Sequence, residues 1–137
     1  MPPRASARVS HPPPGAGPFS KLLGVTEVRA HGDGLEVALE VDERHHNEGG
    51  IVHGGVQMAL LDMAMGGAVV RTLLHGEWTA TSSMTTDFMR PAIKGRLVAR
   101  GRVERRGKLT AFPVGELRDA SGEVVARATG VWAIRTG

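Results

Sequence analysis

The sequence predicts an α+β domain in which a curved antiparallel β-sheet wraps around one long central helix. The first observation is that apolar side chains cover nearly every face of a helix from residue 54 to about residue 75. Such a helix is buried either in a domain or in a membrane. Gln57 and Asp62 interrupt it, which leaves no run of about 18 apolar residues for a bilayer. The second observation is that β-like segments flank this helix in the order β-β-α-β-β-β-β.

The composition fits one globular domain. The chain has 137 residues, of which 41% are hydrophobic and 23% are charged, enough for one core. The absence of cysteine excludes disulfides and is compatible with a reducing cytoplasm, where we expect the protein. Most of the 17 basic residues are arginine, which indicates either a phosphate-bearing ligand or a GC-rich genome. With 4% aromatic residues and no tyrosine, we expect no nucleic-acid partner.

The N-terminal segment, residues 1–18, is predicted to be a flexible tail. It contains six prolines and no apolar run, so it lacks the hydrophobic segment of a secretory signal peptide. The folded domain is therefore predicted over residues 19–137. At its start, residues 19–23 are predicted to form a short helical turn that packs Phe19, Leu22 and Leu23 onto the body of the protein.

The strands are predicted from alternating residues and turn signals. Residues 25–30 and 35–41 flank a Gly-Asp-Gly turn and predict a hairpin. After the helix, turn signals near ten-residue spacing predict an antiparallel meander over residues 79–89, 97–103, 109–117 and 124–134. A helix that is apolar on most sides, and the exposed edges of a sheet, both need cover. We therefore expect at least a homodimer.

A pair of glycines opens the central helix. The N–H groups of Gly54 and Gly55 lie at the positive end of the helix dipole and have no partner within the helix. Such a donor could bind a carbonyl oxygen that gains negative charge in a transition state. The alternative is that the two glycines only allow close packing of the helix on the sheet.

Asp62 follows two turns into the same apolar helix, where an ionised carboxylate is costly without a partner. It is either a base or nucleophile, or a structural aspartate bound by a threonine or a backbone amide. At 1.5 Å per residue, Asp62 lies about 12 Å along the axis from Gly54. A reacting carbonyl needs both groups within about 3 Å. If both act on one substrate, they therefore come from two antiparallel helices in a dimer.

Two other groups of polar residues carry weaker signals. Three histidines lie close in sequence, at His45, His46 and His53, but they lack the spacing of a helical zinc motif. We therefore expect no metal. His53 is expected to fix the loop before the helix. The sequence also has no Gly-x-Ser-x-Gly nucleophile motif. Basic residues are frequent from Arg90 to Lys108; most are expected on a solvated strand face, and those near the turns could reach phosphates.

The residues around the start of the helix carry a family resemblance. The pattern Asn47-x-x-Gly50-x-x-His53-Gly54-Gly55, with Asp62 after it, resembles the signature of the PaaI-type (phenylacetic acid degradation) hotdog-fold acyl-CoA thioesterases. The segment Asp87-Phe-Met-Arg-Pro-Ala92, and the later segments that begin at Gly107 and Gly122, resemble strands of the same family. The resemblance covers residues 19–134. The chain departs from the pattern at His46 and Glu48, where relatives often have an apolar residue and a proline.

The resemblance implies hydrolysis of an acyl-CoA to a free acid and CoA, without a cofactor. It implies that the Gly54 N–H polarises the thioester carbonyl, that Asn47 positions the thioester or the water, and that Asp62 of the partner chain acts as base or nucleophile. His53 would support the loop, and Thr81, found by counting back from Pro91, would orient the water. Substrate contacts are expected at Gly55, Arg90, Lys94, Arg106 and Lys108. Hotdog dimers often pair further, so a homotetramer is expected.

Two alternatives remain at this point. A hotdog hydroxyacyl-CoA dehydratase would need a catalytic histidine paired with a carboxylate, and His53 is present. A non-catalytic acyl-CoA-binding protein would keep the fold alone. The sequence does not identify the acyl group. The methionines of the helix could line a substrate pocket, but methionine is also common in a hydrophobic core.

Overall fold

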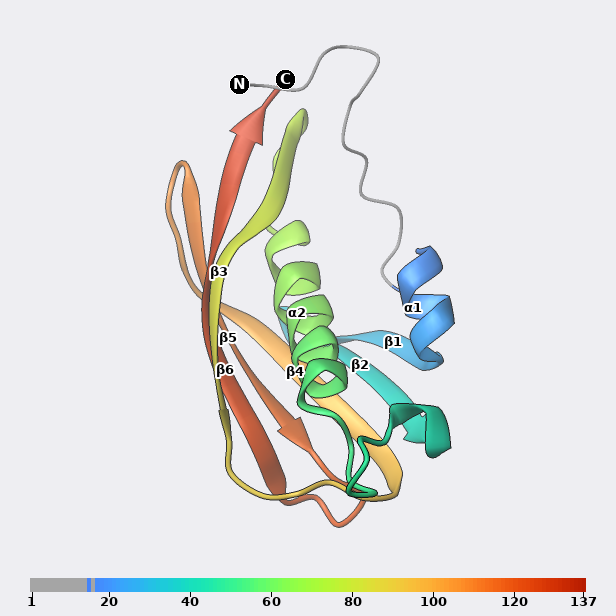
Figure 1. Ribbon diagram of the computed structural model, residues 1–137. Helices are drawn as coiled ribbons and strands as arrows, with labels where there is room; N and C mark the ends of the chain where they lie inside the picture. The colour runs from blue at the N-terminus through green and yellow to red at the C-terminus, as the bar shows by residue number, and fades with distance from the viewer. Residues whose placement is uncertain (1–14, 16) are drawn as a thin grey trace.

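The computed structural model describes Gly15 and residues 17–137, so most of the predicted N-terminal tail lies outside the described residues. The described chain contains two α-helices, one 3-10 turn (Glu43–His45) and six strands (Figure 1). Their bounds are α1 Pro18–Leu23, β1 Val25–His31, β2 Gly34–Val41, α2 Gly54–Val70, β3 Glu77–Phe88, β4 Gly95–Arg106, β5 Thr110–Arg118 and β6 Val124–Thr136. The predicted order β-β-α-β-β-β-β and the α+β hotdog fold are confirmed.

The six strands form one curved antiparallel sheet in the order β1-β2-β4-β5-β6-β3. The predicted meander is correct for β4, β5 and β6 but wrong for β3, which pairs with β6 and forms an edge of the sheet. The connection over residues 89–94 carries the chain across the sheet instead of turning back on β3. Hydrogen bonds hold this connection in place, from the Met89 N–H to the Val125 carbonyl and from the Val52 N–H to the Ala92 carbonyl, both at 2.8 Å.

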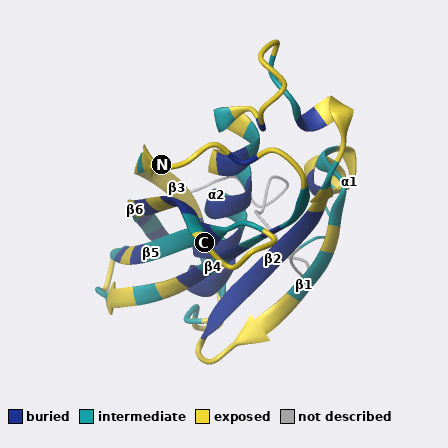
Figure 2. Ribbon diagram, turned by 90° about the horizontal axis from the view of Figure 1, so that it is seen from below, coloured by how far each residue is buried: buried dark blue, intermediate teal, exposed yellow. Residues whose placement is uncertain are grey.

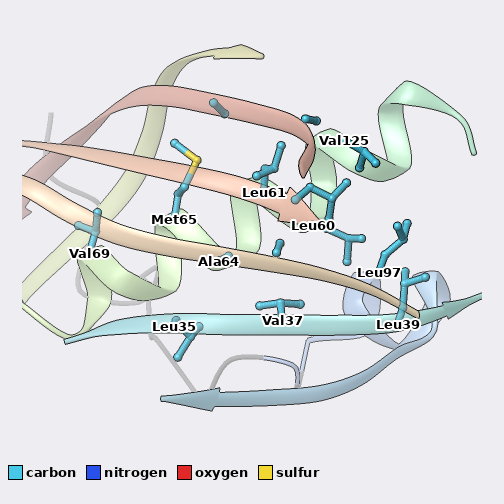
Figure 3. Close-up of a cluster of buried hydrophobic side chains, with 14 of the residues drawn as sticks. Leu35, Val37, Leu39, Leu60, Leu61, Ala64, Met65, Val69, Leu97 and Val125 are labelled. Carbon is cyan, nitrogen blue, oxygen red and sulfur yellow. The ribbon is translucent and has the colours of Figure 1, made fainter. Parts of the chain in front are cut away.

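The core lies between α2 and the concave face of the sheet. Leu60, Leu61 and Met65 of α2 are fully buried, and Figure 3 shows them beside side chains of β2 and β4. Burial of each such side chain stabilises the fold by about 1.5–3 kcal/mol. β2 is buried along most of its length, whereas the edge strand β1 is largely exposed (Figure 2). None of the helices in the described residues is long and apolar enough to cross a membrane.

Two predictions about the helices are corrected. α2 ends at Val70 rather than near residue 75. After Val70 the backbone N–H groups bind carbonyls three residues back instead of four, Thr72 to Val69 at 2.9 Å and Leu73 to Val70 at 3.1 Å, so the α-helical pattern stops. In α1, the Phe19 and Leu22 side chains face solvent instead of packing on the body, with 57% and 73% of their surface exposed.

The outer face of the sheet carries an ion-pair network around a buried carboxylate. Glu36 of β2 is only 3% exposed, and it accepts hydrogen bonds from Arg29 at 2.9 Å and from Arg100 at 2.8 Å. Burial alone would raise the pKa of the Glu36 carboxyl, but the two guanidinium groups outweigh burial and hold this pKa below its ordinary value. The charged form of Glu36 is therefore the one that the fold stabilises.

Candidate active site

The loop before α2 leaves one free backbone donor at the helix N-terminus. The His53 ring caps the helix, because its Nδ1 atom accepts a hydrogen bond from the Gly55 N–H at 2.8 Å. A side chain at position 55 would have its Cβ atom 2.9 Å from His53 Nδ1, so this cap requires glycine. Within the described part of the chain, the Gly54 N–H donates no hydrogen bond. Of the two predicted donors, only Gly54 is thus available to a ligand.

Asn47 organises the same loop through its side-chain oxygen. Asn47 Oδ1 accepts hydrogen bonds from the Gly49 N–H at 2.8 Å and the Ile51 N–H at 3.4 Å. The backbone N–H of Asn47 also donates to the Ile51 carbonyl at 2.8 Å. No contact of its side-chain NH₂ group is seen in the part of the chain that the structure describes. The half-buried carboxamide can therefore donate to a ligand while its oxygen holds the loop.

Asp62 lies at the middle of α2 and faces β3. The Thr81 hydroxyl of β3 donates a hydrogen bond to Asp62 Oδ1 at 2.7 Å, and no group of the described chain is bound to Oδ2. The carboxylate is half-buried rather than enclosed by the core. One oxygen is therefore fixed by Thr81, while the other can accept a proton or attack an electrophile. The same contact also satisfies the structural interpretation of this aspartate.

The carboxylate and the free amide do not meet within one chain. Gly54 and Asp62 lie eight residues apart on one continuous helix, which corresponds to about 12 Å along its axis. Asn47, His53 and Gly54 therefore lie together at the N-terminus of α2, as one half of the candidate site. Asp62 and Thr81 lie near the middle of the helix, as its other half.

A cavity of about 260 Å³ adjoins the carboxylate. Its wall includes Asp62, Met63 and Gly66 of α2, Thr81 of β3 and Trp132 of β6. A larger hollow of about 640 Å³ lies on the outer face of the sheet, and none of the predicted catalytic residues lines it. Because Asp62 itself lines the smaller cavity, this cavity is the one that is relevant to chemistry at the carboxylate.

The four predicted phosphate-binding cations fall into two separate pairs. Arg90 and Lys94 lie in the connection between β3 and β4, whose Ala92 and Ile93 carbonyls bind Val52 and His46 of the loop before α2. Arg106 and Lys108 lie at the turn between β4 and β5, where Arg106 pairs with Glu77 and binds Thr72 beyond the C-terminus of α2. Only Arg90 and Lys94 share an end of the domain with the free amide.

The three histidines of the loop have separate partners. The buried His45 ring binds the Asp42 N–H at 2.9 Å and the Leu23 carbonyl at 2.7 Å, and His46 Nε2 binds the Ile93 carbonyl at 2.8 Å. His53 caps α2, and the described residues contain no group of three or more histidines and carboxylates that could hold a metal ion. The rings thus hold the loop in position.

The Phe88 side chain, for which the sequence predicted no functional role, lies beside the free amide. The Phe88 ring is the nearest side chain to Gly54, since a Cβ atom at position 54 would lie 3.4 Å from its Cζ atom. Phe88, Met89 and Met58 are all large apolar side chains at the surface of the single chain. The last position of a strand carries no periodic signal that marks Phe88. The apolar pattern of α2 predicted that the helix is buried, but it did not predict which apolar side chain of the helix would face outward.

The curved antiparallel sheet around one central helix defines a hotdog-fold protein. The family model of the thioesterase superfamily matches residues 49–126, and the chain therefore belongs to this superfamily.

Three similar proteins extend this comparison. A candidate esterase of Deinococcus radiodurans is 37% identical over 126 residues, which cover 87% of this chain and 84% of that protein. The structure of a phenylacetic acid degradation-related protein of Ralstonia eutropha is 34% identical, with a TM-score of 0.77 over 84% of this chain and 88% of that chain. A Bacillus halodurans protein solved with CoA is 32% identical, with a TM-score of 0.71 over 73% of this chain and 66% of that chain.

Proposed function

We propose that the protein is a PaaI-type acyl-CoA thioesterase that hydrolyses its substrate at a site shared by two protomers. The observation that carries this proposal is the division of the site into two halves on one helix, a free Gly54 N–H and a Thr81-bound Asp62 carboxylate. Membership of the thioesterase superfamily supports hydrolysis of a thioester. The CoA bound to the similar Bacillus halodurans protein supports CoA as the thiol.

The proposed chemistry assigns one role to each group. The Gly54 N–H, at the positive end of α2, binds the thioester oxygen as it becomes negative. The Asn47 amide positions the thioester or the water beside it. Asp62 of the partner removes a proton from a water molecule that attacks the carbonyl carbon, or attacks this carbon itself. The C–S bond then breaks and the CoA thiolate takes up a proton. If water attacked, the acid is released at once; if Asp62 attacked, water hydrolyses the acyl–Asp62 anhydride, which releases the acid and restores the carboxylate.

The free edge of β3 supports assembly through this strand. β3 has twelve residues and pairs only with β6 in the described chain. From Trp78 to Thr86 it carries no charged residue, whereas the opposite edge strand β1 carries Glu27 and Arg29. Uncharged open edges tend to pair with another strand, and charged ones resist it. Antiparallel pairing of two β3 strands would extend the sheet and bring the two α2 helices side by side.

The exposed residues of α2 fit this arrangement. If Gly54 of one antiparallel helix lies level with Asp62 of its partner, the twofold axis passes at the residue halfway between them, which is Met58. Met58 is the large apolar residue of α2 with 38% of its surface exposed. Contact between the two Met58 side chains would remove this apolar surface from water. In the same arrangement the exposed Phe88 beside Gly54 would also lie at the interface.

Arg90 and Lys94 are the proposed contacts of the CoA phosphates. Arg90 pairs with Glu123 at 3.7 Å, and both side chains are more than half exposed, so this ion pair contributes little and can be exchanged for a phosphate. Lys94 is also exposed. Both residues lie in the connection that is bound to the loop before α2.

Release of thiol from a panel of acyl-CoAs tests the proposal. We expect the parent protein to release thiol, and Asp62→Asn and Asn47→Ala to reduce kcat by about 100-fold or more, because each removes a group that acts in the transition state. Thr81→Val should reduce activity and Thr81→Ser should retain it, since serine keeps the hydroxyl. Leu74→Ala, at an exposed site beyond α2, is the control.

The alternatives give different results in this assay. Hydration of crotonyl-CoA without release of thiol would indicate a dehydratase, although His53 pairs with no carboxylate of the described residues. Binding of acyl-CoA without either reaction would indicate a non-catalytic protein. If Asp62→Asn hydrolyses the substrates as fast as the parent, the proposed mechanism is wrong.

A further inference from the structure

Residues 45–53, the Asn47 loop, close on themselves directly before α2. An antiparallel bridge joins the two arms of the loop, and the His53 N–H donates a hydrogen bond to the His45 carbonyl at 2.8 Å. Asn47 lies two residues after His45 on the first arm. On the second arm, Gly54 directly follows the His53 that is bound to His45. The position of His45 therefore affects both the Asn47 amide and the free Gly54 N–H.

The His45 ring is buried, and both of its nitrogens have partners. Nδ1 accepts a hydrogen bond from the Asp42 N–H at 2.9 Å, so this nitrogen carries no proton. Nε2 therefore carries the proton and donates a hydrogen bond to the Leu23 carbonyl at 2.7 Å. The side chain is only 2% exposed, and a buried polar group that loses its partner is costly. This position thus requires the neutral ring in one tautomer.

The two ring hydrogen bonds differ in what they join. The bond to Asp42 lies within a single turn, which the His45 N–H also closes by donating to the Asp42 carbonyl at 3.0 Å. The bond to Leu23 joins this turn to the last residue of α1, 22 residues away. A second link to α1, from the exposed Arg44 guanidinium to the Leu22 carbonyl, is longer at 3.5 Å. The Leu23 bond is therefore the stronger anchor of the loop on α1.

We propose that His45 is a positioning residue for the hydrolysis, and that its ring, bound to Leu23, holds the Asn47 amide and the Gly54 N–H in register beside the thioester. This inference rests on the proposed function. A misplacement of about 1 Å at a reacting group can lower a rate about 100-fold. The buried ring acts through these two groups and is not itself a catalytic residue.

Substitutions of His45 distinguish the two ring bonds. His45→Leu keeps a side chain of similar size but removes both bonds, so it should lower kcat about 100-fold and leave KM little changed. His45→Gln places an amide N–H near the position of Nε2, where it can donate to Leu23, and it should recover about 10-fold of this loss. His45→Asn replaces only the Nδ1 acceptor and should recover less. A higher kcat for His45→Asn than for His45→Gln would overturn the role of the Leu23 bond.

A stability control and a double-mutant cycle exclude a merely structural role. Leu35→Val, in the core beside Gly67 of α2, should lower the Tm, but its folded protein should keep the parent's kcat. In an Asn47→Ala background, His45→Leu should lower kcat by a smaller factor than in the parent, because one of the positioned groups is already absent. Equal factors in the two backgrounds would show that His45 supports only the fold.

Amide hydrogen exchange of the free protein needs no turnover and separates this inference from the proposed function. The N–H groups of Asn47 and His53, which close the loop, should exchange about 10-fold faster in His45→Leu than in the parent. The N–H groups of β4, β5 and β6 should keep the parent's rates. If the parent releases no thiol but exchange rises in this way, the proposed function fails and the hold of His45 on the loop stands. If the parent releases thiol and His45→Leu keeps its kcat, the inference is wrong.

Discussion

The partners of each polar group decide what it can do at this site. Gly54 and Gly55 are equivalent in the sequence, but the His53 ring occupies the Gly55 N–H and leaves the Gly54 N–H free. Asp62 has one oxygen bound by the Thr81 hydroxyl. The sequence pattern identified Asn47, His53, Gly54 and Asp62 as a group. Their hydrogen bonds depend on side-chain rotamers and on pairing between distant segments, which the pattern does not contain.

At the residue scale, Glu36 provides a test of stability against pH. Because the folded state holds the pKa of Glu36 below the ordinary glutamate value of 4.5, this carboxylate stabilises the fold above that pH, and the stabilisation is lost as the pH falls through the folded-state pKa. Glu36→Gln should lower the free energy of unfolding by about 1–2 kcal/mol at neutral pH. The difference from the parent should shrink below about pH 4.5. Chemical denaturation across this range measures it.

Glu40→Gln is the matched control on the same strand. The Glu40 side chain is 60% exposed and lies 3.9 Å from Arg96, and exposed pairs of this kind contribute about 0–1 kcal/mol. Its effect should therefore be small at every pH. A Glu36→Gln variant whose stability deficit does not change between neutral and acidic pH would contradict the assigned role of the carboxylate.

At the scale of elements, the contact between α2 and β4 determines how closely the helix sits in the sheet. Gly101 of β4 lies directly under the backbone of Ala64 and Met65, and a Cβ atom there would overlap the Ala64 carbonyl group. Backbone atoms cannot move aside as a flexible side chain can. Gly101→Ala should therefore cost about 1–3 kcal/mol or more and lower the Tm.

Gly17→Ala is the control for this prediction, because no atom lies within 4 Å of the position of its Cβ atom. Its Tm should stay close to that of the parent. If Gly101→Ala melts at the same temperature as Gly17→Ala, the helix does not pack on β4 as closely as described. Any loss of thiol release in Gly101→Ala should equal the loss of folded protein, because the substitution lies outside the candidate site.

Sequence patterns predict some of the elements correctly and miss others. The hairpin of β1 and β2 and the meander of β4, β5 and β6 follow from alternation and short turns, because neighbouring segments pair through local connections. The placement of β3 at the edge does not follow, since a crossing connection of six residues has no periodic signal. The apolar pattern continues to Leu74, so it does not mark the end of α2 at Val70, where the backbone hydrogen bonds change from the carbonyl four residues back to the one three residues back.

At the scale of the whole molecule, mixed dimers test whether two protomers share each site. An Asp62→Asn chain retains Asn47 and Gly54, and an Asn47→Ala chain retains Asp62. In a twofold dimer of the two variants, one of the two sites is intact. With random assembly, half of the dimers are mixed, so co-expression should restore about a quarter of the parent's activity. Thiol release from the purified mixture measures this recovery.

The control mixture combines Asp62→Asn with Thr81→Val. Asp62 and Thr81 lie in the same half of the site, so no combination of these two chains restores a complete site, and the mixture should add nothing to the activity of its parents.

Because the chain has no native cysteine, Met58→Cys also allows cross-linking at the proposed twofold axis. The shared site is wrong if the mixture of Asp62→Asn and Asn47→Ala is no more active than the two variants alone and Met58→Cys forms no cross-link.

The sequence by itself determined the thioesterase superfamily, the order of the elements and the burial of one apolar helix. These follow from local motifs and from periodicities of two and 3.6 residues, which depend only on neighbours along the chain. Tertiary structure alone decided that β3 forms an open edge, that Thr81 binds Asp62, and that the His45 ring binds the Leu23 carbonyl. Each of these joins segments distant in sequence, and close packing in three dimensions fixes which side chains meet.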